Sequence, residues 1–328
     1  MPDVIKKEIM RKLLTKLAEG GVLVGPVDTG KVVEYKKTDA DATLMDDRVS
    51  YKSPKEFYFP QTEKLLTFSG DEAVENIDVP PTVIFGAKSC DLEALRVMSA
   101  VFMEGRYADP FFERHMEKNI IIGVGCKAKK PGCFCDELGL DMEFSDFCDI
   151  LLTDTGDAYK VEHLSEKGKS ALSKLPETAD VTCDNKRTAK KPEGDAIGLS
   201  ADLEDAELFS AVDWSELTAT CQGCGMCTYI CPTCHCFEFK DVLKDGDIER
   251  YRCWDSCIYP KFTLHASGHN PRASRADRYR QRVLHKYLYV KKNTGFAACT
   301  GCGRCLRSCP VGVNIKNVAK AVMEAVAK

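Results

Sequence analysis

One cysteine pattern occurs twice in the C-terminal half of this chain. Each copy has the spacing C-x2-C-x2-C-x3-C, and a proline follows the fourth cysteine. The members are Cys221, Cys224, Cys227 and Cys231, followed by Pro232, and Cys299, Cys302, Cys305 and Cys309, followed by Pro310. Thiolates at this spacing are typical ligands of [4Fe-4S] cubanes. Structural zinc is the alternative, but zinc sites usually have paired C-x2-4-C knuckles. The duplicated run therefore predicts two [4Fe-4S] clusters.

The last cysteine of each run is predicted to serve the cluster of the other run. In ferredoxins with two cubanes, three close cysteines hold one cluster, and the distant fourth, before proline, is donated to its neighbour. This rule assigns Cys221, Cys224, Cys227 and Cys309 to cluster 1, and Cys299, Cys302, Cys305 and Cys231 to cluster 2. Peptide N–H groups beside the glycines of these runs are expected to donate hydrogen bonds to cluster sulfur.

Size, charge and cysteine usage narrow the class of protein. The chain has 328 residues, enough for two domains, and a net charge of −4, which speaks against nucleic-acid or anionic-membrane partners. The N-terminus lacks the apolar core of a signal peptide, and no apolar run is long enough to span a membrane, so we expect a cytoplasmic protein. Its eighteen cysteines then serve as reduced thiols and metal ligands, and exposed clusters favour an anaerobic host.

The first part of the chain, residues 1–200, is predicted to be an α/β domain with a mixed sheet. Apolar residues recur at helical spacing over 4–18, and Asp91 opens a second helical pattern. Apolar or alternating runs predict strands, with a strand–helix–strand order in the middle and a hairpin around Gly156 and Asp157. The runs are 22–27, 32–35, 57–59, 64–68, 82–86, 120–125, 149–154 and 158–164.

The second part, residues 201–328, is predicted to be an α-helical two-cluster domain of the ferredoxin type. A polar segment at 176–200 marks the boundary, and helical patterns precede each cysteine run. A last amphipathic helix follows Pro310. Residues 232–298 separate the two runs, which is a long insert for a ferredoxin core.

Four further cysteines predict a third cluster. Cys90 follows the strand at 82–86, and Cys126 follows the strand at 120–125. If these strands are parallel neighbours, their carboxyl ends place both cysteines at one sheet edge. Cys133 and Cys135 lie in the loop that follows. A zinc site, or scattered thiols with a chance pair, are the alternatives.

A second group of cysteines adjoins the first run. Cys234, Cys236, Cys253 and Cys257 either hold another metal centre or pack as thiols around the clusters, and spacing alone does not choose between these. Cys148 and Cys183 are expected to be ordinary thiols.

The remaining sequence features concern nucleotide binding and positive charge. No G-x-G-x-x-G or P-loop sequence is present, so the chain shows no site of its own for NAD(P), FAD or ATP. The basic stretch 269–282 is interpreted as neutralising anionic clusters or docking an acidic partner subunit, with nucleic-acid binding as the weaker alternative. Arg304 stands in the second run where Met226 stands in the first. The extra charge predicts a higher reduction potential for cluster 2.

Several phrases resemble one family. The chain is similar to the iron–sulfur β subunits of cytosolic sulfhydrogenases and to the A subunit of anaerobic sulfite reductase; related subunits accompany flavin oxidoreductases that feed heterodisulfide reductases. Residues after 139 and the presence of Cys253 depart from the family pattern. The matching phrases are KSPKEFYFPQTEKLLTF (52–68), VIFGAKSCDLEAL (83–95), CFCDELG (133–139), CPTCHCF (231–237), CWDSCIYPKFTLHASGHNPR (253–272) and DRYRQRVLHKYLY (277–289).

The resemblance implies an electron-transfer subunit that is not itself catalytic. It would relay electrons between a flavin-containing NAD(P)H oxidoreductase subunit, which carries FAD and binds NAD(P), and a catalytic subunit. That subunit would be a hydrogenase, a sulfite reductase or a heterodisulfide reductase. The alternative is a catalytic or substrate-binding subunit that uses Cys234, Cys236 and Cys257.

Overall fold

The chain divides into two compact units, each of which is built from more than one segment. The computed structural model describes residues 4–46, 48–179, 197–200 and 202–327. Unit 1 comprises Met1–Pro60, Ile77–Pro131 and Leu140–Pro192, and unit 2 comprises Gln61–Asn76, Gly132–Gly139 and Glu193–Lys328. The predicted cut at residue 200 did not anticipate that residues 61–76 and 132–139 group with the C-terminal part. Most of the predicted boundary segment, residues 180–196, lies outside the described residues.

Unit 1 is built on a mixed sheet, as the sequence predicted. Its strand order is β1-β9-β8-β7-β6-β2-β3. The neighbours β2, β6, β7 and β8 are parallel, and β1, β3 and β9 pair antiparallel to their neighbours. The strands are β1 (Val4–Lys6), β2 (Val22–Asp28), β3 (Val33–Lys37), β6 (Thr82–Ala87), β7 (Asn119–Val124), β8 (Ile150–Asp154) and β9 (Ala158–His163).

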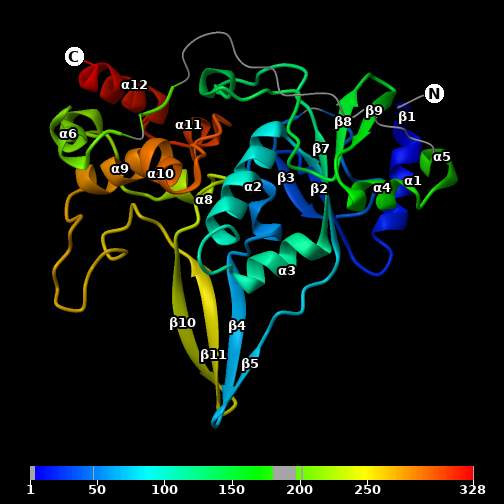
Figure 1. Ribbon diagram of the computed structural model, residues 1–328, viewed down its shortest axis with the longest axis horizontal. Helices are drawn as coiled ribbons and strands as arrows, with labels where there is room; N and C mark the ends of the chain where they lie inside the picture. The colour runs from blue at the N-terminus through cyan, green and yellow to red at the C-terminus, as the bar shows by residue number, and fades with distance from the viewer. Residues whose placement is uncertain (1–3, 47, 180–196, 201, 328) are drawn as a thin grey trace. The chain divides into compact units, whose positions relative to one another are not determined.

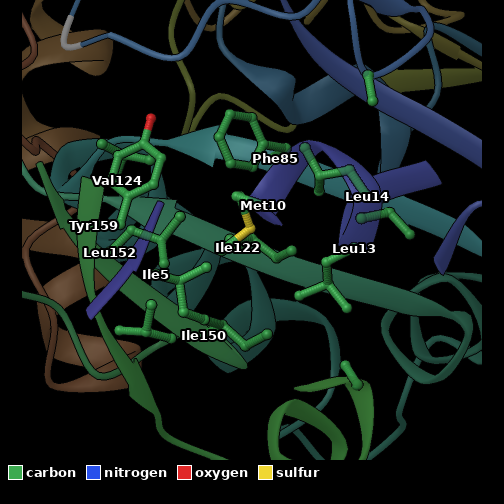
Figure 2. Packing of buried hydrophobic residues seen from close by; sticks show 14 of the residues in the cluster. Ile5, Met10, Leu13, Leu14, Phe85, Ile122, Val124, Ile150, Leu152 and Tyr159 are labelled. Atoms are coloured by element: carbon green, nitrogen blue, oxygen red, sulfur yellow. The ribbon is translucent and has the colours of Figure 1, made fainter. Parts of the chain in front are cut away.

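Helices cover both faces of this sheet. Helix α1 (Lys7–Leu17) buries Met10, Leu13 and Leu14 against Phe85, Ile122 and their neighbours on one face (Figure 2). On the other face, Leu92 of α2 (Ser89–Phe102) fills the space that a side chain at Gly123 would occupy. The strands are apolar on both sides because both faces are covered. The remaining helices of the unit are α3 (Pro110–Lys118), α4 (Glu166–Leu172), α5 (Pro176–Ala179) and the 3₁₀ helix η1 (Pro54–Phe57).

Two predicted elements of the N-terminal part differ in the structure. Residues 4–6 form β1, paired with β9, and the helix begins only at Lys7. The run 57–59 is not a strand, because Ser53 caps a 3₁₀ turn that opens with Pro54. The two aromatic residues that follow, Tyr58 and Phe59, are buried against other aromatic rings. This run is apolar because its side chains are buried, and not because it forms a strand.

Unit 2 contains an antiparallel sheet that the sequence did not predict. Its order is β10-β11-β4-β5, so strands far apart in the chain lie side by side (Figure 1). A hairpin through Asp245 and Gly246, both at positive φ, joins the two strands of the insert. Arg252 and Glu63 form a buried ion pair of 2.5 Å across the β11–β4 pair. The strands are β4 (Thr62–Ser69), β5 (Glu72–Glu75), β10 (Phe237–Lys244) and β11 (Asp247–Trp254).

The rest of unit 2 is helical, as predicted for the cluster domain. Its apolar core joins α9, the π-helical turn η3 and α12, with Leu284, Leu288 and Val322 among the fully buried side chains. The elements are η2 (Asp136–Leu138), α6 (Asp205–Ser210), α7 (Trp214–Leu217), α8 (Met226–Tyr229), α9 (Arg275–Leu284), η3 (His285–Tyr289), α10 (Val290–Thr294), α11 (Arg304–Arg307) and α12 (Ile315–Val326). Across the described residues, every helix is too short or too polar to cross a membrane.

Candidate iron–sulfur centres

The cysteines assigned to cluster 1 surround one cavity of unit 2. The cavity holds about 430 Å³ of empty volume, and Cys305 also reaches its wall. The first run turns sharply before α8, because Gly223 and Gly225 both have φ in the left-handed region, at 71° and 75°. The amide of Gly223 donates a hydrogen bond to the Cys221 sulfur. The cluster 1 cysteines on this wall are Cys221, Cys224, Cys227 and Cys309.

The cysteines assigned to cluster 2 surround a second cavity, of about 330 Å³. The second run repeats the turn of the first, since Gly301 and Gly303 have φ of 61° and 69°, and the amide of Gly301 donates to the Cys299 sulfur. Each cavity therefore combines three cysteines of one run with the fourth cysteine of the other. The cluster 2 cysteines on this wall are Cys231, Cys299, Cys302 and Cys305. Within the described residues, no three His, Cys, Asp or Glu side chains are grouped closely enough for a single metal ion.

Buried cations line these cavities. The sequence analysis had interpreted the stretch 269–282, which includes Arg282, as neutralising clusters or docking an acidic partner, but it had not predicted this burial or singled out Lys286. Arg282 lies on the wall of both cavities and Lys286 on the wall of the second, and each is 2% exposed. Arg304, in the second run, is 1% exposed. Burial lowers the pKa of Arg282, but the negative charge of Cys227 and further thiolates outweighs this and raises the pKa well above its usual value. Positive charge thus stays where anionic clusters would lie.

The π-helical turn η3 supplies two residues that sequence reasoning missed: Lys286 on the wall of the second cavity, and Tyr287, which contacts one of its cysteines. Lys286 donates a hydrogen bond of 2.5 Å to the hydroxyl of Thr233, and Tyr287 donates one of 3.4 Å to the Cys299 sulfur. A hydrogen bond from Cys234, together with the charges of Lys286 and Arg282, holds the pKa of Cys231 well below its usual value. A single widened helical turn is often found at functional sites. No periodicity in DRYRQRVLHKYLY signals it.

The segment Gly132–Gly139 packs against the second cysteine run. The amide of Phe134 donates to the carbonyl of Gly301 at 2.8 Å, and the Cys133 thiol donates to the carbonyl of Cys302 at 3.4 Å. Arg307 contacts both the Cys133 sulfur and the Cys302 carbonyl. Two of the four cysteines predicted for a third cluster, Cys133 and Cys135, therefore lie beside the cluster 2 loop, within unit 2.

The other two predicted ligands of a third cluster lie together in unit 1. Strands β6 and β7 are parallel neighbours, and Cys90 and Cys126 follow their carboxyl ends. One carbonyl, that of Met142, accepts hydrogen bonds from both the Ser89 hydroxyl and the Cys126 amide. This ties the two cysteine-bearing turns to each other. The joint use of these two pairs of cysteines stays a prediction.

The remaining cysteines take different positions. The Cys234 thiol hydrogen-bonds Cys231, on the wall of the second cavity, and the Cys257 thiol hydrogen-bonds Cys236. These bonds, with burial, raise the pKa of both Cys234 and Cys257. Cys253 lies on β11, opposite Glu238 of β10 and Thr62 of β4. Cys148 is a buried thiol before β8 whose pKa burial raises, and Cys183 lies outside the described residues.

Comparison with known proteins agrees with these centres. A family model described as "4Fe-4S dicluster domain" matches residues 220–313, which span both cysteine runs. The chain is 31% identical to sulfhydrogenase 2 subunit beta of Pyrococcus furiosus over 333 residues, covering 98% of each chain. No solved structure matches the chain. Identity at this level over nearly the full length of both chains is the mark of common descent, and the chain belongs to the family of sulfhydrogenase β subunits, with an iron–sulfur dicluster domain at its C-terminal end.

Proposed function

We propose that this subunit relays single electrons through the two [4Fe-4S] sites of unit 2. The observation that carries the proposal is the pair of adjoining cavities, whose walls share Cys305 and Arg282 and interleave the two cysteine runs. A cubane at each site would supply one-electron redox chemistry with little rearrangement of the protein. Adjoining walls would keep the two electron-carrying sites close together.

The residues present fit such clusters. Each cavity wall carries the four cysteines predicted for its cluster, and glycine amides donate to cysteine sulfur, which stabilises a thiolate. Arg282 and Lys286 offset the negative charge of the ligands from buried positions. A single zinc ion would not need cavities of about 430 and 330 Å³. The chain's part in electron transfer is to bind, insulate and tune these sites.

Anaerobic purification with iron analysis tests the proposal directly. We expect at least about eight irons per chain after full reconstitution, because each cubane holds four. The reduced protein should show two interacting cluster signals and should exchange electrons with a flavoprotein, while turning over no small substrate alone. Zinc in place of iron, or fewer than about eight irons, would contradict the relay.

We further propose a third cluster, held by Cys90, Cys126, Cys133 and Cys135. The support is local: the first two lie on hydrogen-bonded turns of unit 1, and the last two lie on a segment bound to the cluster 2 loop. Such a site would feed electrons to or from cluster 2.

Cys126→Ser should lower the iron content from about twelve to about eight per chain, since a cubane lacking one thiolate is lost. The EPR signals of clusters 1 and 2 should persist. Cys148→Ser is the matched control in the same unit, because its buried thiol lies outside the proposed ligand set, and it should keep all the iron. Unchanged iron in Cys126→Ser would remove this cysteine from the ligand set.

The subunit is proposed to work within a multi-subunit, hydrogenase-type complex in the cytoplasm. The support is the relative's description as a sulfhydrogenase β subunit. From the family resemblance we assign FAD and NAD(P) to a flavin-containing oxidoreductase partner; the sequence of this chain itself has no dinucleotide fingerprint. A hydrogenase, a sulfite reductase or a heterodisulfide reductase subunit would stand at the other end, with no nucleic acid or membrane among the partners. Co-purification from the native organism identifies the terminal subunit.

Arg304→Met should lower the reduction potential of cluster 2. A positive side chain stabilises the reduced, more negative cluster, and Arg304 is fully buried in the loop that carries three of its ligands. Met226, at the equivalent position of the first run, should leave cluster 1 as the lower-potential site. An EPR-monitored titration measures both potentials. The absence of a downward shift for cluster 2 would refute this role for Arg304.

A catalytic role is the second candidate, and one contact favours it. Cys257 and Cys236 are hydrogen-bonded thiols, and Cys234 contacts a ligand of the second cavity, so a small substrate could meet thiols next to a redox centre. The isolated, reduced subunit should then turn over a sulfur substrate, and Cys236→Ser should abolish that turnover. The relay predicts no turnover in either protein.

A further inference from the structure

Arg282 occupies a singular position between the two cavities. It lies in the last turn of α9, and it is the cationic side chain that lines both cavities among the described residues. Its Nη2 donates a hydrogen bond of 2.9 Å to the carbonyl of Cys227. Its Nε and Nη1 are fully buried and have no hydrogen-bond partner within the described part of the chain. Two of the three guanidinium nitrogens of Arg282 therefore have no acceptor among the described residues.

Burying these N–H groups is unfavourable in free energy unless an acceptor forms hydrogen bonds with them. A buried N–H left without a partner costs about 1–3 kcal/mol, and more when the group is charged. The cysteines whose negative charge acts most strongly on Arg282 are Cys227 of cluster 1, then Cys234, which lies outside both predicted ligand sets, and then Cys305 and Cys231 of cluster 2. Because Arg282 lies on the wall of both cavities, sulfur atoms of clusters in these cavities would be acceptors available to its unmet donors.

We propose that Arg282 is a shared tuning residue whose guanidinium donates to sulfur at both iron–sulfur sites and raises both reduction potentials together. The inference rests on the proposed electron relay. A positive charge stabilises the reduced form of each site, because reduction adds a negative charge. A charge common to both sites moves the two potentials in the same direction, so the energy step between them changes less than either potential.

Two neighbouring cations make this inference specific. Lys286, one helical turn further on, lines the second cavity but not the first over the described residues, so its charge should act mainly on cluster 2. Arg280, on the same helix as Arg282, instead pairs with Asp277 and lies over the ring of Phe209. Of these three cations within seven residues of the described chain, Arg282 lines both cavities, Lys286 lines one and Arg280 lines neither. If the helix acted only through its total charge, replacing any of the three would change the potentials alike.

The test is an EPR-monitored redox titration of the full chain and its variants. Arg282→Met should keep both clusters and lower both potentials, each by at least about tenfold in the reduction equilibrium, or about 59 mV for one electron. Lys286→Met should lower the potential of cluster 2 alone. Arg280→Met should move neither. Arg282→Lys should recover part of the shift at both sites because it keeps the charge.

The outcomes separate this inference from the relay itself. Full iron in Arg282→Met with potentials unchanged, or with only one changed, overturns the shared role and leaves the relay intact. If the wild-type chain does not bind two clusters, the relay proposal itself is wrong. Should Arg282→Met fail to load, Arg282→Gln decides, because it is neutral but keeps N–H donors: a joint fall of both potentials supports the inference, and any other result overturns it.

Discussion

Replacing Cys231 by serine should remove the cluster that belongs to the opposite run. Cys231 lies on the wall of the second cavity with Cys299, Cys302 and Cys305, while Cys309 lies on the wall of the first. Cys231→Ser and Cys309→Ser should therefore each lose about four irons per chain, because the cubane that lacks one thiolate ligand is lost. Iron analysis and EPR spectroscopy measure the loss.

Double variants decide whether the runs exchange ligands. If Cys231 serves the second site, Cys231→Ser with Cys299→Ser should still lose only about four irons, since both act on one cluster. Cys231→Ser with Cys221→Ser should lose about eight. The opposite pattern would mean that each run holds its own cluster. Cys253→Ser, on strand β11, is the control and should keep all the iron.

Gly301→Ala should destabilise the cluster 2 loop much more than the equivalent change in the first run. A Cβ at Gly301 would lie 2.5 Å from the Cys135 amide nitrogen and 2.6 Å from two further backbone atoms of Phe134 and Cys135. These close atoms are backbone atoms and cannot rotate away as the end of a flexible side chain can. The whole segment Gly132–Gly139 must therefore move to make room. Such overpacking adds about 2 kcal/mol to the cost of left-handed φ.

Gly223→Ala is the matched control for that change. Gly223 has a similar φ of 71°, but the nearest atom to its added Cβ is 4.0 Å away, in the side chain of Arg275. Only the conformational cost of about 1–2 kcal/mol should remain. Urea midpoints for loss of cluster absorbance compare the two variants. Equal midpoints would show that segment Gly132–Gly139 does not rest on this loop.

The sequence predicted the parts of this molecule that local pattern determines. Cysteine spacing identified the dicluster domain, and the strand–helix–strand order predicted the parallel pairing of β6 with β7. The pairing of β4 with β11 escaped prediction because their register depends on residues 180 to 191 positions apart, such as Phe68 with Ile248 and Thr62 with Cys253. The sequence shows alternation within a strand, but it does not show which distant strand is its partner.

The burial of the cations escaped prediction for a different reason. Charged residues are almost never fully buried unless they are paired, so a helix with the sequence DRYRQRVLHKYLY suggests a solvated face. Arg282 and Lys286 are nevertheless inside, next to thiol-lined cavities. Their environment is set by the cysteines of other segments, which helical periodicity does not include. The charge of the stretch was recognised, but the buried face was not.

The pairing of β4 with β11 also has a consequence for how the protein is made. Strand β4 leaves the ribosome about 180 residues before β11, a delay of about ten to thirty seconds at ordinary rates of translation. During that interval β4 can pair with β5, but its backbone groups on the edge that faces β11 lack their native partners, and Glu63 lacks Arg252. Segment Gly132–Gly139 waits for a similar stretch of chain, about 165 residues, until the loop at Gly301 has been made. Because Cys299 and Cys309 both come well after β11 in the chain, neither cysteine-lined cavity is complete until almost the whole chain has been made.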